Sequence, residues 1–135
     1  MTEYYMGVDL GLHSDKTAIV VGHLDNHDQI RIDLVTTLQA NVQNPMTIRM
    51  VVKIIREIDT EYSIAEGQFD TWCGIPFAQA LEAVGLNNFI CESDSETESD
   101  ALSRENLSDF SLDDDVMDSL RRLISVIRRN HARRE

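Results

Sequence analysis

An aspartate at the end of an apolar segment is the feature that most constrains the fold of this sequence. Residues 4–8 lead directly into Asp9, and a second apolar segment, residues 17–24, follows soon after it. Both segments have the length and composition of β-strands. Removing a carboxylate from water beside an apolar strand is costly unless a cation compensates its charge. Asp9 therefore indicates a cation site at the end of the first predicted strand.

The rest of the chain predicts alternating strands and helices. Strands are expected over residues 4–10, 17–24 and 29–38, and a helix should begin at Asn44-Pro45, with Asn44 as N-cap, and end near Thr60. A strand should follow over 62–69, at a distance that suits a parallel crossover, and then a helix over 74–84 closed by Gly85. A short strand over 88–91 precedes a final helix, whose apolar stripe consists of Val116, Leu120, Leu123, Ile124 and Ile127.

No repeat or linker divides the sequence, so we expect a single domain over residues 1–135, with an acidic loop over 92–111. The net charge is −12, and eleven acidic residues lie between Glu92 and Asp118 against Arg104 alone. This excess argues against tight unaided DNA binding, which needs clustered lysine and arginine. A nucleic-acid function would therefore depend on metal ions, on the arginines that follow Ser119, or on a partner.

Neither a membrane segment nor a disulfide framework is expected. The sequence has no run of about 18 apolar residues, and it does not begin with a basic segment that leads into an apolar one. Cys73 and Cys91 form no paired motif, so we expect reduced thiols in a cytoplasmic protein, in the host cytoplasm if the chain is viral.

Carboxylates at the ends of three predicted elements are candidates for one metal site. If the strands that end near Asp9 and Asp70 are parallel neighbours, both residues lie at the edge where α/β sheets bind ligands. The last helix would add Asp115 and Asp118, which are spaced i, i+3 and share a face. Such oxygen ligands suit one or two Mg²⁺ or Mn²⁺ ions. Glu66 shares the strand face of Asp70 and is a reserve candidate for its role.

Each aspartate also has a purely structural interpretation. Asp9 could be a surface residue of an edge strand, Asp70 could be the N-cap of the helix over 74–84, and residues 113–115 could cap the last helix. The occurrence of all three clusters in one chain favours the metal site.

Three motifs follow one another along the sequence. The first is Gly-Val-Asp-Leu-Gly at residues 7–11 with the apolar segment after it, and the second is Phe-Asp-Thr-Trp at residues 69–72 with the helix and glycine that follow. The third is Asp-Asp-Asp-Val-Met-Asp-Ser-Leu at residues 113–120. In this order they resemble the nuclease domain of large terminase subunits, the motors that cut viral DNA during packaging, in which histidine is common at the position of Asp113.

This resemblance implies an α/β ribonuclease H-like fold, a five-stranded mixed sheet flanked by helices, three strands being antiparallel and two added in parallel. It also implies a metal-dependent endonuclease that cleaves double-stranded DNA with Mg²⁺ or Mn²⁺. Asp9, Asp70 and Asp115 would be the catalytic metal ligands, with Asp114 or Asp118 assisting. The family's ATPase domain is not in the sequence, so a separate ATPase domain or packaging partner is expected.

Five basic residues are candidate DNA contacts: Lys16, Arg49, Lys53, Arg121 and Arg128. Basic stripes of this kind are also common on solvated helix faces. Three other functions stay open. The last segment is similar to RuvC-like Holliday-junction resolvases, which would prefer branched DNA. Gly-Val-Asp-Leu-Gly also opens the actin-like nucleotide-binding fold, and the chain could be an inactive docking domain.

Overall fold

The computed structural model describes residues 2–11, 16–39, 43, 47–70, 74–92 and 114–134. The elements in chain order are β1 (Tyr4–Asp9), β2 (Lys16–Leu24), β3 (Ile30–Gln39), α1 (Ile48–Tyr62), β4 (Ile64–Asp70), α2 (Gly74–Ala83), β5 (Phe89–Glu92) and α4 (Asp114–Arg134). The expected order of strands and helices is confirmed.

One mixed sheet of five strands, in the order β3-β2-β1-β4-β5, forms the centre of the fold. β1 pairs antiparallel with β2, and β2 pairs antiparallel with β3. β4 joins the other side of β1 in parallel, and β5 joins β4 in parallel. The five-stranded mixed sheet expected from the sequence, with three antiparallel strands and two parallel additions, is therefore confirmed.

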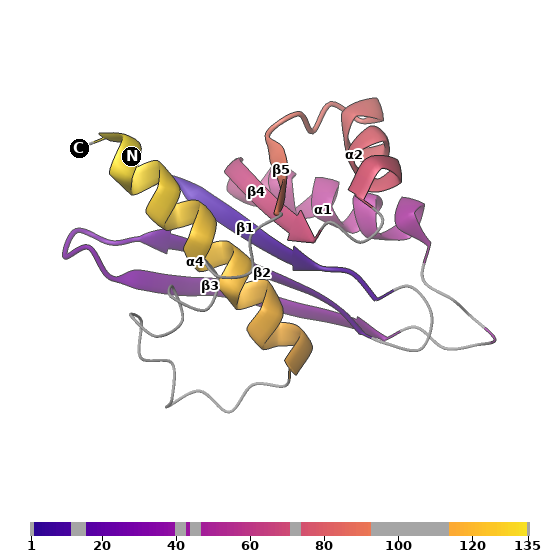
Figure 1. The fold of residues 1–135 in the computed structure, drawn as a ribbon, viewed down its shortest axis with the longest axis horizontal. Coiled ribbons are helices and arrows are strands. Elements are labelled where there is room, and N and C mark those ends of the chain that lie inside the picture. The colour runs from indigo at the N-terminus through magenta and orange to yellow at the C-terminus, as the bar shows by residue number, and fades with distance from the viewer. Residues whose placement is uncertain are drawn as a thin grey trace.

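Two apolar layers cover the two faces of the sheet. Side chains that alternate along β1 separate them: Met6 and Val8 pack against α1 and α2, whereas Tyr5 packs against α4. Figure 1 shows α4 lying across one face of the sheet, with α1 and α2 on the other. No described helix is long and apolar enough to cross a membrane.

Glycine at position 7 lets α4 pack directly on β1. A Cβ atom built on Gly7 would lie 2.0 Å from the carbonyl oxygen of Ser119 and 2.6 Å from the backbone nitrogen of Leu123. No side chain fits in that space, so the first glycine of the Gly-Val-Asp-Leu-Gly motif sets how closely the helix approaches the strand.

The boundaries of α1 differ from those expected. The helix begins at Ile48, and the hydroxyl of its N-cap Thr47 accepts a hydrogen bond from the Met50 backbone N–H, so the prediction of Asn44 as N-cap is wrong. Asn44-Pro45 lies outside the described residues. The helix ends at Tyr62, and Ser63 closes it with a left-handed φ of 55°. β4 consequently begins at Ile64, two residues later than expected.

The other boundaries follow the sequence more closely. Gly85 follows α2 with φ +86°, the left-handed conformation expected of a residue that closes a helix. Glu92 is the last residue of β5, one residue beyond the predicted strand. Residues 93–111, the rest of the predicted acidic loop, lie outside the described residues.

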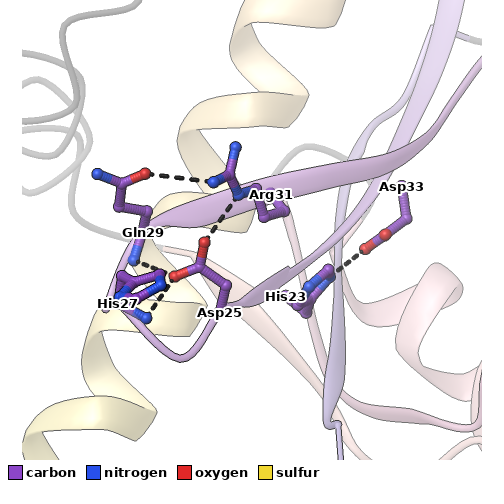
Figure 2. Close-up of polar contacts among 6 residues, drawn as sticks. All are labelled: His23, Asp25, His27, Gln29, Arg31 and Asp33. Atoms are coloured by element: carbon purple, nitrogen blue, oxygen red, sulfur yellow. Dashed lines mark hydrogen bonds and ion pairs between the residues drawn. The ribbon is translucent and has the colours of Figure 1, made fainter.

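The turn between β2 and β3 is ordered by one carboxylate. Asp25 Oδ1 accepts hydrogen bonds from the backbone N–H groups of His27 and Gln29, and Asp25 Oδ2 accepts one from Arg31 Nε at 2.8 Å (Figure 2). Two of these hydrogen bonds, first that from the Gln29 N–H and second that from Arg31, lower the pKa of Asp25 from 3.8 to about 2. The turn between the two strands thus contains a carboxylate that accepts its backbone N–H groups.

The same hairpin holds a histidine–aspartate pair. His23 Nδ1 lies 2.7 Å from Asp33 Oδ2 across β2 and β3 (Figure 2). The His23 ring also packs edge-on against the Tyr4 ring. His23 is 21% exposed and Asp33 is 23% exposed, so both side chains are partly shielded from solvent. Tyr4 pairs with His23 at the start of β1, so this cluster lies at the end of the strand away from Asp9.

Candidate functional site

Asp9 is the last residue of β1, on the strand face that α4 covers. It continues the alternation that places Tyr5 and Gly7 under the helix. Its side chain is 13% exposed, so most of the carboxylate surface is removed from water. The interpretation of Asp9 as a surface residue of an edge strand is wrong, because β1 lies between β2 and β4 in the sheet.

Asp70 is the last residue of the parallel strand beside β1. The pairing of these strands runs to Val8 opposite Phe69, and Asp9 and Asp70 are the next residue of each strand. Asp70 in turn pairs with Glu92 at the end of β5. Three acidic residues therefore end three neighbouring parallel strands at one edge of the sheet. The side chains of Asp70 and Glu92 lie outside the described part of the structure.

The position of Asp70 in the strand bears on its interpretation as a helix cap. α2 begins at Gly74, so Asp70 belongs to the strand and is not the residue that precedes the helix. The prediction of Asp70 as N-cap of that helix is therefore wrong.

The N-terminal end of α4 lies at the same edge of the sheet. Near this end the Ser119 hydroxyl donates a hydrogen bond to the carbonyl oxygen of Ala18, the residue paired with Asp9. Near the other end, the Asn130 amide donates to Glu66, which pairs with Tyr5 near the start of β1. The helix thus runs back along β1, from the end at Asp9 towards the strand's beginning (Figure 1).

The acidic start of α4 is therefore brought to the edge that Asp9 and Asp70 occupy. Asp114 and Asp115 are the first two residues of the helix and lie one turn before Ser119. Their side chains, like Asp113 as a whole, lie outside the described part of the structure. Among the described residues, no three histidine, cysteine, aspartate or glutamate side chains are grouped as a metal site. The backbone places the three acidic clusters together, and the individual ligands stay a prediction.

Asp118 has a cationic partner on its own helix. Its Oδ1 lies 2.5 Å from Arg121 Nη1, and the two side chains are 39% and 37% exposed. Arg121 is a candidate DNA contact and Asp118 a candidate metal ligand. For either residue to take that role, the ion pair between them would have to break or lengthen.

Glu66 has a structural role, and its prediction as a reserve ligand is not supported by its contacts. Its Oε2 accepts hydrogen bonds from Arg129 Nη2 at 2.9 Å and from the Asn130 amide. Arg129 Nη1 also donates to the fully buried Gln68. This polar network fastens the C-terminal half of α4 to β4, and Glu66 lies four residues before Asp70 on the same strand.

Arg122 is the residue at the site that sequence patterns did not reveal. Its Nη1 lies 3.8 Å from Asp9 Oδ1, and its side chain is only 7% exposed. The nearest signal in the sequence is its spacing, because Arg122 follows Ser119 by three residues and Asp118 by four and so shares a helix face with them. Nothing in that spacing identifies Asp9, 113 residues earlier, as its partner.

The predicted DNA contacts are spread over different surfaces. Lys16 opens β2, at the sheet edge where Asp9 lies, because Ala18 pairs with Asp9. Arg128 is partly buried in the second half of α4. Arg49 and Lys53 are exposed on α1, on the opposite face of the sheet, where with Arg56 they line a groove whose other lining residues are Ile48, Val52, Ala80, Ala83 and Val84. The five residues do not form one continuous track.

No model of a known protein family matches the sequence, and no curated protein matches it. Several solved structures, however, are similar to the structure of this chain. The large terminase of bacteriophage HK97 superposes with a TM-score of 0.74 over 93% of this chain at 14% identity. The protein described here has a terminase nuclease-like fold. It spans about 40% of the HK97 protein.

Two further structures share this fold over most of their own length. The magnesium-bound large terminase nuclease of thermophilic phage G20c has a TM-score of 0.68 and 19% identity, with 92% of this chain and 81% of that chain covered. RuvC of Thermus thermophilus, in complex with a Holliday junction substrate, has a TM-score of 0.66 and 10% identity, with 95% and 96% covered. The terminase-like and RuvC-like resemblances seen in the motifs are thus confirmed at the level of the fold.

Proposed function

We propose that this chain is a metal-dependent endonuclease that cleaves double-stranded DNA, as the nuclease module of a DNA-packaging system. The observation that carries the proposal is the meeting of Asp9, Asp70 and the acidic start of α4 at one edge of the sheet. The fold shared with a magnesium-bound terminase nuclease supports it.

The residues at this edge fit a hard divalent cation. The candidate ligands are all carboxylates, which is the oxygen donor set that Mg²⁺ and Mn²⁺ prefer. We propose that Asp9, Asp70 and Asp115 hold the metal, with Asp114 or Asp118 assisting. Bound there, one or two such ions would activate a water molecule and stabilise the leaving oxygen of a phosphodiester.

The chain itself supplies position and charge. β1 and β4 are central strands with fixed register, so the backbones of Asp9 and Asp70 are held rigidly side by side. The Gly7 contact and the Ser119 hydrogen bond fix the height of α4 above them. Lys16, which starts β2 at the same edge, is the described cation best placed to contact a DNA phosphate.

The direct test is cleavage of supercoiled plasmid. With Mn²⁺ or Mg²⁺ at low salt, the protein should nick and linearise the plasmid with little sequence preference, and a chelator should abolish the reaction. The same ions should stabilise the fold: at a hundredfold excess over Kd the gain is about 2.7 kcal/mol, which raises Tm by roughly 2–8 °C. An absence of both cleavage and stabilisation would leave the inactive docking domain as the better account.

A second candidate is a junction resolvase, because the fold covers almost all of RuvC. A resolvase would cut a four-way junction faster than a linear duplex of the same sequence and would act as a dimer. Equal rates on the two substrates by a monomer would favour the terminase-like function. A packaging nuclease should also gain activity or affinity for DNA from a separate ATPase partner.

A further inference from the structure

A buried arginine on α4 stands beside the candidate metal ligand Asp9. The Arg122 side chain is 7% exposed, and its Nη1 donates a hydrogen bond of 2.8 Å to the carbonyl oxygen of Asp118, one helical turn earlier. Both partners of this bond belong to α4. The position of the guanidinium is therefore fixed by the helix and does not depend on Asp9 alone.

Arg122 Nη1 and Asp9 Oδ1 form an ion pair. Arg122 Nη1 and Asp9 Oδ1 are 3.8 Å apart, which is farther than a hydrogen bond spans. At that distance opposite charges still attract, and because both side chains are largely removed from water, solvent and salt screen them little. Arg122 thus compensates the charge of Asp9 without a direct hydrogen bond through this pair of atoms.

The same charge must oppose a metal ion. A divalent cation that binds Asp9 comes close to a guanidinium that carries a charge of the same sign. The helix holds this group in place through the Asp118 carbonyl. The arginine therefore has opposite effects on the metal-free and the metal-bound protein.

We propose that Arg122 is a positioning residue that acts as a built-in counter-cation of Asp9. It holds the Asp9 carboxylate in place in the metal-free protein, and it lowers the affinity of the site for a divalent cation. This inference rests on the proposed metal site. Arg122 thus supplies from α4 part of the positive charge that balances the carboxylates of the site, and this stabilises the fold before a metal binds. Because the same charge lowers the affinity for the ion, the fraction of protein that holds a metal depends on the metal concentration.

The test is calorimetric titration of Mn²⁺ into the full chain, which requires no turnover. Arg122→Gln removes the charge and should tighten Mn²⁺ binding about tenfold, because a like charge near the ion is lost. Arg122→Lys keeps the charge and should stay close to wild type. Arg56→Gln is the matched control, since it removes the same charge from an exposed position on α1, on the other face of the sheet, and should leave the affinity unchanged.

Each outcome supports or overturns the inference. If wild type binds Mn²⁺ and Arg122→Gln binds it equally or more weakly, the counter-cation role is wrong while the metal site stands. If no protein binds Mn²⁺, the metal site and the inference both fall. Binding by Arg122→Gln alone would support the inference and overturn metal dependence of the wild-type protein.

A second measurement covers the case in which Arg122→Gln does not fold. Arg122→Met fills a similar volume without charge and allows the same titration. In the metal-free protein, Asp9→Asn should lower Tm, and adding Arg122→Met to Asp9→Asn should restore part of that loss. If the two substitutions lower Tm additively, Asp9 and Arg122 are not coupled, and the inference is wrong.

Discussion

Individual residues at the site are paired in ways that change what a substitution should do. Clustered carboxylates on their own would repel one another, and from the sequence we expect Asp9→Asn to keep or even increase the stability of the metal-free protein. The structure reverses this expectation for Asp9, because its charge compensates Arg122, whose side chain is 7% exposed.

Asp9→Asn should therefore destabilise the metal-free protein by about 1–3 kcal/mol, since it leaves a buried cation with less compensation. Urea unfolding in the presence of a chelator measures the change. Asp28→Asn is the control: the same chemical change is made at an exposed turn residue whose φ of 61° asparagine also tolerates. A gain in stability for Asp9→Asn would show that repulsion among the carboxylates dominates the site.

Asp25 predicts a pH dependence of the β2–β3 hairpin. Hydrogen bonds from the Gln29 N–H and from Arg31 lower the pKa of Asp25 from 3.8 to about 2. The ionised carboxylate therefore stabilises the folded hairpin above pH 3.8, and this contribution is lost as the pH falls through about 2. Amide exchange in the hairpin, followed between pH 2 and 5, should lose this dependence in Asp25→Asn. An unchanged profile would mean that other carboxylates control the acid response.

At the scale of elements, α4 is held to the sheet by a few close contacts that position its acidic start. Gly7 admits the helix backbone, the Ser119 hydroxyl bonds to β2, and Glu66 with Gln68 holds Arg129 and Asn130 at the far end. The sequence predicts the helix from its apolar stripe, but it does not reveal these contacts, because they join residues more than 60 positions apart.

Gly7→Ala should move or loosen α4. The new Cβ would lie 2.0 Å from a backbone oxygen of the helix, so we expect a loss of about 3 kcal/mol or more in the free energy of unfolding. Cleavage should fall as well, because the acidic start of α4 shifts from Asp9. Gly85→Ala is the comparison: nothing lies within 4 Å of its Cβ, and its φ of +86° should cost about 1–2 kcal/mol without loss of cleavage. If Gly7→Ala and Gly85→Ala lower the free energy of unfolding and the cleavage rate equally, the close packing of α4 on β1 at Gly7 is refuted.

At the scale of the whole molecule, the sequence predicts the order of strands and helices but does not predict which charged residues pair. Apolar periodicity and turn residues locate the strands and helices of the described residues, because these signals depend on neighbours in the chain. The sequence does not fix the start of α1, because Asn44 and Thr47 are both suitable caps, and the structure shows the Thr47 hydroxyl accepting the capping hydrogen bond from the Met50 N–H. The partners of Asp9 and Glu66 lie on α4 and depend on how that helix crosses the sheet.

The most direct test of the proposed site is the rate of plasmid cleavage in Mn²⁺ for four variants: Asp9→Asn, Asp70→Asn, Asp115→Asn and the control Asp28→Asn. Each change keeps the shape of the side chain and removes one charge, so loss of a metal ligand should abolish nearly all cleavage while Asp28→Asn retains the wild-type rate. If Asp115→Asn is active while Asp114→Asn or Asp118→Asn is not, the ligand on α4 has been assigned to the wrong residue. Wild-type cleavage by Asp9→Asn or by Asp70→Asn would contradict a metal site at this edge of the sheet.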